Sequence, residues 1–208
     1  MKKDSLSAQA RAKIEELILQ GVLRDKVTER DLADRLVMSR APVREAMREL
    51  LIDGLLERIS SRTVVVRNLN LDEIEEIYRI RTSLEAQAAE LAAQRVTPDE
   101  LSDFRSLHEQ MLDAAEREDF AVYYQCNIDF HRKIHQAARS PRLAAIIEQV
   151  MKESLLFRSR GLVDRENVEQ SIVEHQQLLQ ALEKHDAELA SLFMTRHIAG
   201  GLRRLHLR

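Results

Sequence analysis

The sequence predicts a mostly α-helical protein: three short helices and a two-stranded β-hairpin, followed by a six-helix antiparallel bundle. Three observations support this fold class. Gly and Pro together number only eight in 208 residues and Trp is absent, whereas long Ala-, Leu-, Glu- and Arg-rich stretches favour helix. Each of the three prolines falls in an expected first helical turn, where its missing N–H costs nothing. Residues 63–66 are Thr-Val-Val-Val, a β-branched run that favours a strand over a helix.

The first third of the chain contains the start and stop signals of these short elements. In chain order, we expect helices over about 5–21, 28–36 and 42–53, then short strands over about 58–59 and 63–67. Thr28 can cap the second helix while Asp31 reaches back, and Gly54 follows the third helix as a C-cap. Residues 28–67 therefore have the order of a winged helix-turn-helix, in which the second helix of the motif enters the DNA major groove.

The rest of the chain has helical periodicity throughout. Asn68-Leu69-Asn70 forms a linker, and Thr97 and Ser140 each precede a proline as hydroxyl N-caps. The six expected helices span about 71–95, 97–117, 119–138, 141–160, 165–184 and 186–206. Because the connections are short, neighbouring helices should run antiparallel. We therefore predict two domains, residues 1–68 and residues 69–208.

Composition limits the class of protein and its location. Hydrophobic residues make up 44% of the chain and charged residues 32%, which indicates a soluble globular protein rather than a disordered or fibrous one. No apolar run approaches the ~20 residues that cross a bilayer, and Met1-Lys2-Lys3-Asp4 lacks the apolar segment of a secretory signal. The lone Cys126 fits a reducing interior. We expect a cytoplasmic protein without membrane contact.

The net charge of −3 hides an asymmetry between the two predicted domains. Residues 1–68 carry 14 basic and 11 acidic side chains, whereas residues 69–208 carry 18 and 24. A basic first domain and an acidic second domain suggest that any contact with nucleic acid lies in the first.

A row of arginines runs along the second helix of the helix-turn-helix. Arg40, Arg44 and Arg48 recur every four residues. The apolar back of the helix consists of Val43, Ala46, Met47, Leu50 and Leu51. The planar fork of an arginine can take guanine O6 and N7 together or clamp a phosphate. The alternative is a solvated face neutralised by nearby glutamates, but the order of helix, turn, helix and wing favours DNA contact.

Four helices of the predicted bundle each direct a polar group toward its axis. The groups are Arg81, Asn127 with His131, His175, and His197. Three imidazoles and an amide oxygen can bind a metal ion, and imidazole suits Zn, Ni, Fe or Mn equally. His135 is a rival ligand, and any single histidine on an apolar face is more often a satisfied core residue. A buried Arg81 needs an anion, and no inward glutamate is expected to act as a general base.

The first domain resembles the GntR family of bacterial regulators. The resemblance rests on residues 28–46, on the string Ser39-Arg40-Ala41-Pro42-Val43-Arg44-Glu45-Ala46 within them, and on Asp53-Gly54-Leu55. It implies that Arg30, Ser39, Arg40 and Arg44 contact DNA and that Arg62 at the wing tip reaches toward the minor groove. Two positions depart from the family pattern. Ala41 replaces the usual Thr, and no glycine follows Arg62, so we expect a wing tip of another shape.

The second domain is similar to the FCD effector domain of the FadR-like branch, in its six-helix VanR-type subgroup. The matching segments are residues 78–85, residues 127–131, Glu174-His175 and His197. The resemblance implies a divalent metal ion held by Asn127, His131, His175 and His197, with Arg81 beside a carboxylate effector. Asn127 stands where the family most often has Asp, so we expect weaker metal binding. Arg158 is a further candidate for gripping an anion.

These observations favour a ligand-responsive transcription regulator, and a repressor over an activator. We expect it to bind double-stranded DNA as a homodimer at a near-palindromic operator, because one helix-turn-helix reads only a few base pairs. A small organic acid would be the effector. Two alternatives stay open: a metal-dependent hydrolase or isomerase that uses the histidines to activate water, and a histidine cluster with a purely structural role. The enzyme alternative leaves the first 68 residues unexplained, so we do not expect an enzyme.

Overall fold

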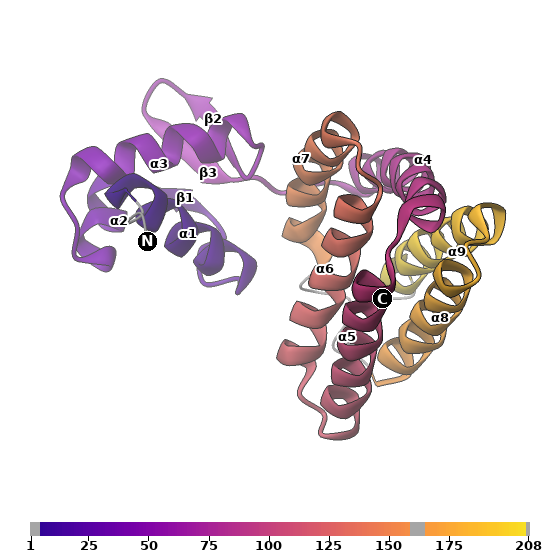
Figure 1. Cartoon of the computed structure of the whole chain (residues 1–208). Coiled ribbons are helices and arrows are strands. Elements are labelled where there is room, and N and C mark those ends of the chain that lie inside the picture. Colours follow the sequence, from indigo (N-terminus) through magenta and orange to yellow (C-terminus); the bar gives the residue numbers. More distant parts are fainter. Residues whose placement is uncertain (1–4, 159–164, 207–208) are drawn as a thin grey trace. The chain divides into compact units, whose positions relative to one another are not determined.

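The computed structural model describes residues 5–158 and 165–206 (Figure 1). Within these ranges the chain separates into two compact units. The N-terminal unit contains residues 5–71 and 152–158, and the C-terminal unit contains residues 72–151 and 165–206. The described part is mostly helical, with a small sheet in the N-terminal unit. The predicted fold class is therefore confirmed. Among the described residues, no helix combines the length and the apolar character that crossing a membrane requires.

The N-terminal unit contains three helices and three strands. The helices are α1 (Leu6–Leu19), α2 (Glu29–Leu36) and α3 (Arg40–Ile52), and the strands are β1 (Lys26–Val27), β2 (Leu56–Ser60) and β3 (Thr63–Val66). The sheet is antiparallel with the order β1-β3-β2. The sequence predicted only two strands. The third, β1, is two residues long, which is too short to produce an alternating pattern, and it forms because Val27 pairs with Val64 and is buried.

The core of this unit lies between the helices and the sheet. Residues of α1 and the apolar back of α3 are buried together with Leu32, Leu56 and Val66. The helix α3 begins at Arg40, two residues before the predicted start at Pro42, with Ser39 as its N-cap. Pro42 is therefore the third helical residue, a position that still lacks an intrahelical N–H partner. This earlier start places Arg40 on the helix itself.

The hairpin turn forms without a glycine. Ser60 pairs with Thr63, so the turn residues are Ser61 and Arg62, and the register shifts between Arg58 and Ser60. None of Ser61, Arg62 and Thr63 is among the described residues with positive φ. The extra residue of a bulge increases the local twist, which allows a tight turn here without the left-handed residue that a glycine would supply. A tight turn at the wing tip is therefore compatible with the absence of glycine there.

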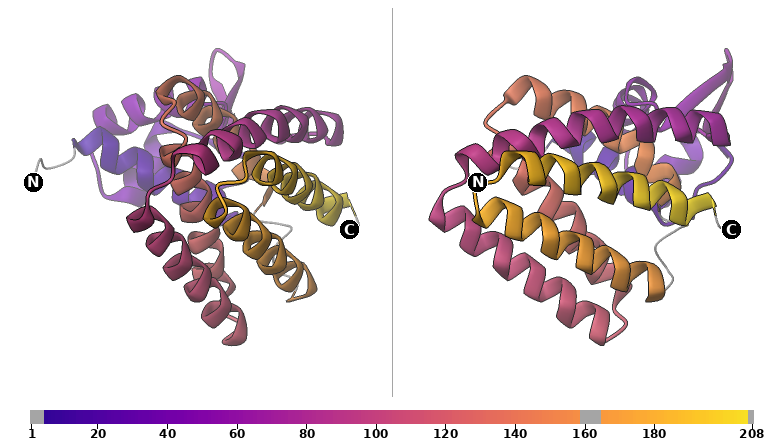
Figure 2. Two further views of the ribbon diagram at one scale, coloured as in Figure 1. Left: turned by 45° about the vertical axis from the view of Figure 1, so that its right-hand side comes forward. Right: turned by 90° about the vertical axis from the view of Figure 1, so that its right-hand side faces the viewer.

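Six helices follow in the described part of the chain. They are α4 (Leu71–Arg95), α5 (Pro98–Glu116), α6 (Phe120–Ala137), α7 (Pro141–Arg158), α8 (Arg165–Glu183) and α9 (Ala187–His206). Each begins and ends within a few residues of its predicted bounds. The C-terminal unit contains these helices except for the first residue of α4 and residues 152–158 at the end of α7. Thr97 and Glu100 form the capping box at the start of α5. The helix α5 packs against α6 and α8, and α8 packs against α9 (Figures 1 and 2).

The interior of this bundle contains an unusual number of polar side chains. Those nearly or fully inaccessible to solvent are Arg81, Glu85, His108, Asn127, His131, His135, Ser171, His175, His197 and Arg204. A buried polar group costs free energy unless it is hydrogen-bonded. The partners of these groups therefore define the candidate site.

Candidate functional site

Six arginines surround a groove in the N-terminal unit. The groove has a volume of about 450 Å³ and is bordered by α3, the start of α2 and the β2–β3 hairpin. Its arginines are Arg30, Arg40, Arg44, Arg48, Arg58 and Arg62. All six side chains are exposed, and Glu29 is the acidic residue in the lining. Four of the five predicted DNA contacts, all except Ser39, thus line one positively charged groove.

Most of these guanidinium groups are not neutralised within the protein. In the part of the chain that the structure describes, no ion pair involves Arg40, Arg44, Arg58 or Arg62. Arg48 pairs with Glu45 at 3.0 Å, and Arg30 lies 3.8 Å from Asp34. Both of these pairs are exposed, where ion pairs contribute little. The alternative of a face neutralised by glutamates therefore applies to Arg48 and not to Arg40 or Arg44.

The start of α3 has donors without an internal partner. Ser39 is the N-cap, yet its exposed hydroxyl makes no capping hydrogen bond. The first N–H groups of a helix have no intrahelical acceptor and carry a partial positive charge. A phosphate is the anion that such a helix start commonly binds.

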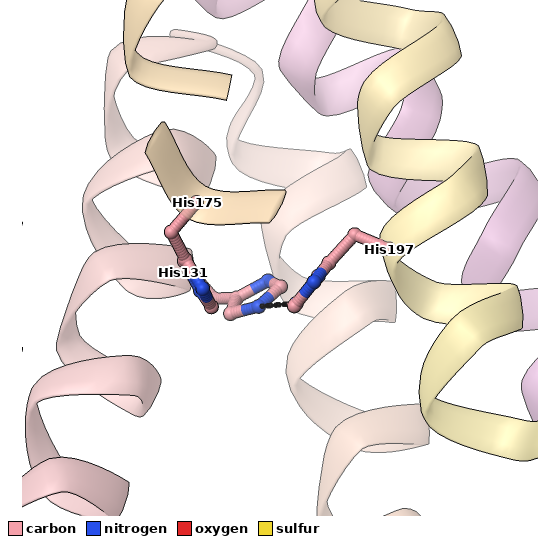
Figure 3. A group of neighbouring side chains, drawn as sticks. All are labelled: His131, His175 and His197. Atoms are coloured by element: carbon pink, nitrogen blue, oxygen red, sulfur yellow. Dashed lines mark hydrogen bonds between the residues drawn. The ribbon is translucent and has the colours of Figure 1, made fainter. Parts of the chain in front are cut away.

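Three histidines from three helices meet inside the C-terminal unit (Figure 3). His131 of α6, His175 of α8 and His197 of α9 are buried, and one ring nitrogen of each lies within 4.8 Å of the other two. The Nε2 atoms of His131 and His197 are 3.1 Å apart. The structure thus brings together three of the four predicted metal ligands.

The Nδ1 atom of each of the three rings lies within hydrogen-bond distance of an oxygen atom. The Nδ1 of His131 lies 2.6 Å from Glu85 Oε2, and that of His197 lies 2.7 Å from Glu174 Oε2. The Nδ1 of His175 lies 2.7 Å from the backbone oxygen of Ser171. Carboxylate and carbonyl oxygens only accept hydrogen bonds. Each Nδ1 therefore carries a hydrogen, and in its neutral form each ring turns the lone pair of its Nε2 toward the other rings.

The arrangement fits a metal ion better than a hydrogen-bonded cluster. Two lone pairs 3.1 Å apart repel unless a cation lies between them. A proton shared by His131 and His197 would still leave the buried Nε2 of His175, which finds no hydrogen-bond partner among the described residues. A metal ion would use all three nitrogens, and bonds of about 2.0–2.1 Å allow ligand nitrogens about 3 Å apart. Nδ1 hydrogen bonds to carboxylate or carbonyl are the usual support of metal-binding histidines.

Burial and neighbouring charges keep the groups around the histidines in the required ionisation states. Burial works to raise the pKa of Glu85, but the Arg81 guanidinium and the His131 ring together lower it by more, and the pKa lies well below its usual range. Burial first, and then the neighbouring rings, hold the pKa of His175 well below its usual range. Glu85 is therefore an anion, and the His175 ring is neutral.

Arg81 has an anionic partner inside the protein. Its Nε and Nη2 donate to Glu85 Oε1 at 2.9 and 2.6 Å, and both side chains are almost completely buried. The anion that a buried arginine requires is therefore supplied by Glu85. Glu85 is an inward glutamate that the sequence analysis did not name, and it lies one helical turn after Arg81 on the same face of α4. Its charge is stabilised by that arginine.

The remaining predicted site residues have different outcomes. Asn127 is buried one turn before His131, and its Nδ2 has no hydrogen-bond partner among the described residues. The rival ligand His135 instead faces Glu85, with 3.4 Å between its Nε2 and Glu85 Oε2. Glu85, His131 and His135 form a second group with metal-ligating atoms, but the Arg81 charge on the same carboxylate opposes a cation there. The side chain of Arg158 lies outside the described residues.

Comparison with known proteins identifies both units. Residues 6–66 match the profile described as "Bacterial regulatory proteins, gntR family", and residues 76–200 match the FCD domain. The chain belongs to the GntR family. The order of a GntR helix-turn-helix and an FCD domain confirms the resemblance on which the sequence analysis relied, and six helices in the described FCD unit are consistent with the VanR-type subgroup.

Transcription regulators of this family resemble the chain over most of its length. It is 32% identical over 176 residues to the "Probable D-xylose utilization operon transcriptional repressor" of Paenarthrobacter nicotinovorans, covering 85% of this chain and 77% of that protein. It is 30% identical over 152 residues to the HTH-type transcriptional regulator McbR of Escherichia coli, covering 72% and 69%. A solved structure of E. coli McbR/YncC has a TM-score of 0.84 at 25% identity and 99% coverage of both chains. These relatives are transcription regulators, which are not enzymes.

Sequence reasoning missed the carboxylates that hold the histidines. In this GntR-family chain, Glu174 precedes His175 on α8 but serves His197 on α9, so only the packing of two helices reveals its role. Glu85 was detectable, because it stands four residues after Arg81 and an i, i+4 pair of opposite charge shares one helix face. Ser171 contributes a backbone oxygen, which no side-chain pattern records.

Proposed function

We propose that this GntR-family regulator binds a near-palindromic DNA operator as a homodimer, and that a small carboxylate effector beside a divalent metal ion controls its affinity for DNA. The DNA contacts would be Arg30, Ser39, Arg40, Arg44 and Arg62. The metal ligands would be His131, His175 and His197, with Asn127 as the fourth. The observation that carries the sensing part is the convergence of three Nε2 lone pairs, each fixed by an acceptor on Nδ1.

The arginine groove supports the DNA-binding part of the proposal. Arg40 and Arg44 are exposed, lie on one helix and have no internal anion within the described residues. Desolvating them therefore requires an external anion or a base edge, and the bidentate pairing of arginine with guanine supplies both charge and direction. Operators read by two such helices are commonly near-palindromes, because the protein dimer is two-fold symmetric.

The charge of the histidine site supports an anionic effector. The carboxylates of Glu85 and Glu174 are each paired with an arginine, Arg81 and Arg204, and the proposed ligands are all neutral. A bound divalent ion would supply two uncompensated positive charges and act as a Lewis acid toward a carboxylate oxygen. Glu85 accepts hydrogen bonds from the Nε and Nη2 of Arg81. The remaining group, Nη1, would therefore be the one that contacts the effector. Arg158 stays a prediction for a second anion contact.

The direction of regulation is inferred from relatives. The P. nicotinovorans relative is named a transcriptional repressor, as is RspR of E. coli, which is 25% identical over 173 residues. A repressor whose effector weakens DNA binding would release its operator when the organic acid accumulates. A coupling free energy of about 1–3 kcal/mol between effector and DNA would change operator affinity about 5–150-fold.

Fluorescence anisotropy with labelled DNA tests the two parts separately. The probe is the duplex upstream of the protein's own gene, compared with a scrambled duplex at moderate salt, and we expect a preference of at least about 10³-fold. The titration is then repeated with chelator, with Zn²⁺ and with a panel of mono-, di- and tricarboxylic acids. No sequence preference would remove the regulator proposal. A preference that neither chelator nor any acid changes would reduce the histidine group to a structural role.

A further inference from the structure

Two consecutive glycines, Gly200 and Gly201, lie in the interior of α9. Glycine in a helix interior costs about 1 kcal/mol relative to alanine. Neither residue belongs to the described glycines with positive φ, which are Gly21 and Gly54. Backbone conformation therefore does not require either glycine, and the space around each one has to be considered.

The space around the two glycines differs. A Cβ atom on Gly200 would lie 2.9 Å from Glu174 Oε1 and 3.1 Å from Arg204 Nη1, closer than side chains normally approach. A Cβ atom on Gly201 would lie 3.5 Å from Tyr78 Cε1, which is an ordinary van der Waals contact. Gly200 alone is therefore crowded by a neighbouring side chain, and Gly201 is a natural control in the same helix.

The carboxylate that fills this space connects α8 to α9. Glu174 Oε2 accepts a hydrogen bond from His197 Nδ1 at 2.7 Å, and Arg204 donates to both oxygens at 2.9 and 3.0 Å. His197, Gly200 and Arg204 are spaced three and four residues apart, so they share one face of α9. Because Gly200 has no side chain, the Glu174 carboxylate can lie against this face and contact both His197 and Arg204.

We propose that Gly200 is a positioning residue, which leaves room for the Glu174 carboxylate and thereby holds the His197 ring with its Nε2 toward His131 and His175. The link to metal binding rests on the function proposed above. Glu174 Oε1 is the end of a flexible side chain, so an added methyl group at residue 200 would displace the carboxylate without preventing folding. The crowded Oε1 is the oxygen that Arg204 Nη1 contacts. Because the carboxylate is rigid, moving Oε1 also moves Oε2, so His197 loses the acceptor that fixes its tautomer and orientation.

The test compares Gly200→Ala with Gly201→Ala in the full chain, labelled with ¹⁵N-histidine. In the chelated wild-type protein, NMR should show the His197 ring with hydrogen on Nδ1, and a His197→Gln variant assigns that signal. Gly201→Ala should keep this tautomer and raise the thermal midpoint, because alanine is the better helix former. Gly200→Ala should keep the helical circular dichroism but lose the Nδ1–H tautomer of His197.

Co²⁺ titration gives a second readout through its visible absorption. Gly201→Ala should bind Co²⁺ with wild-type affinity and spectrum, whereas Gly200→Ala should bind about 10–100-fold more weakly, the usual effect of removing a group that orients a ligand. Glu174→Gln, which keeps the side-chain size but removes the charge that pairs with Arg204, should weaken Co²⁺ binding in the same direction. It serves as the test if Gly200→Ala does not fold.

The two proposals fail in different ways. If Gly200→Ala keeps the wild-type tautomer of His197 and the wild-type Co²⁺ affinity, the positioning role is overturned. If Gly200→Ala does not fold, a wild-type Co²⁺ affinity in Glu174→Gln overturns it instead. If the wild-type chain binds no Co²⁺, Zn²⁺ or Ni²⁺, the metal part of the proposed function fails. The tautomer comparison then decides the role of Gly200 alone.

Discussion

The arginine groove and the histidine site use polar side chains in opposite ways. In the groove, Arg40 and Arg44 are exposed and lack an internal ion-pair partner among the described residues. In the histidine site, His131 and His197 are buried and each is tied to a carboxylate through Nδ1. Water can solvate the first kind of group until DNA arrives, whereas the second kind must be satisfied within the protein.

This difference predicts different effects of substitution. Removing an exposed, unpaired charge should change binding and leave stability nearly unchanged. Removing a buried, paired group should change stability, because its partner is left without compensation. The same chemical change, a charged side chain replaced by alanine, therefore separates the two regions when stability and binding are both measured.

The largest expected effect is on the stability of the FCD domain in Glu85→Ala. This change leaves the buried Arg81 guanidinium without its anion and His131 without its acceptor. We expect the free energy of unfolding to fall by about 3–5 kcal/mol, as for other buried ion pairs that lose one partner. Urea unfolding in the presence of chelator, at constant protein concentration, measures the loss.

Glu169→Ala is the matched control in the same domain. Glu169 pairs with Arg165 at i, i+4, but that pair is exposed, so its removal should change the free energy of unfolding by less than about 0.5 kcal/mol. Equal losses in the two variants would show that Arg81 does not depend on Glu85 for compensation.

The second effect is the loss of metal-linked stabilisation in His175→Ala. With Zn²⁺ at about 100 times its dissociation constant, binding should stabilise the wild-type protein by about 2.7 kcal/mol. A 100-fold weaker site would retain about 0.4 kcal/mol at the same Zn²⁺ concentration. Thermal midpoints with Zn²⁺ and with chelator measure the difference. His108→Ala, a buried histidine outside the group of three, should keep the Zn²⁺ response, and the same loss in both variants would contradict a local site.

The third effect is confined to DNA binding. Arg44→Ala should weaken specific binding by about 1–3 kcal/mol for each operator half-site, with a thermal midpoint close to that of the wild type. Arg35→Ala is the control, because Arg35 is exposed on α2 but does not line the groove. Anisotropy titrations at a fixed salt concentration measure both. A large fall in the thermal midpoint of Arg44→Ala would mean that its guanidinium is structurally engaged.

The fold and the groove could be predicted because their signals are local. The proline at Pro98 with Thr97 before it marks the start of α5, and the four-residue recurrence of Arg40, Arg44 and Arg48 describes one helix face. The strand β1 could not be predicted, since two residues carry no period and its formation depends on β3, about 40 residues later in the chain.

The histidine site could be predicted only in part. His131, His175 and His197 interrupt apolar stripes, and the stripes identify the inward face of each helix. Their partners follow from packing between helices: Glu85 lies 46 residues before His131 and Glu174 lies 23 residues before His197. Helical periodicity gives the face of a residue but not its height relative to a neighbouring helix, and the height decides which carboxylate meets which ring.

The smallest effect concerns Asn127, the predicted fourth ligand. Asn127→Asp adds a negative charge to a buried position in a site whose other charges are already paired. Without metal, that charge lacks a compensating partner, so the chelated protein should have a lower thermal midpoint than the wild type. With metal, a carboxylate is the stronger ligand, and Zn²⁺ affinity should rise about tenfold, or about 1.4 kcal/mol.

These opposite signs make Asn127→Asp informative. A substitution that only disturbs packing would lower the thermal midpoint equally with and without Zn²⁺. If residue 127 is a metal ligand, Asn127→Asp should lower the midpoint in chelator and increase the rise in midpoint on adding Zn²⁺. Asn127→Leu, which has a similar volume and no oxygen, should raise the midpoint in chelator because the unpaired amide is removed, and should weaken Zn²⁺ binding. If Zn²⁺ affinity is the same in all three proteins, Asn127 is not a ligand, and the metal would be held by three histidines with its remaining positions open to the effector.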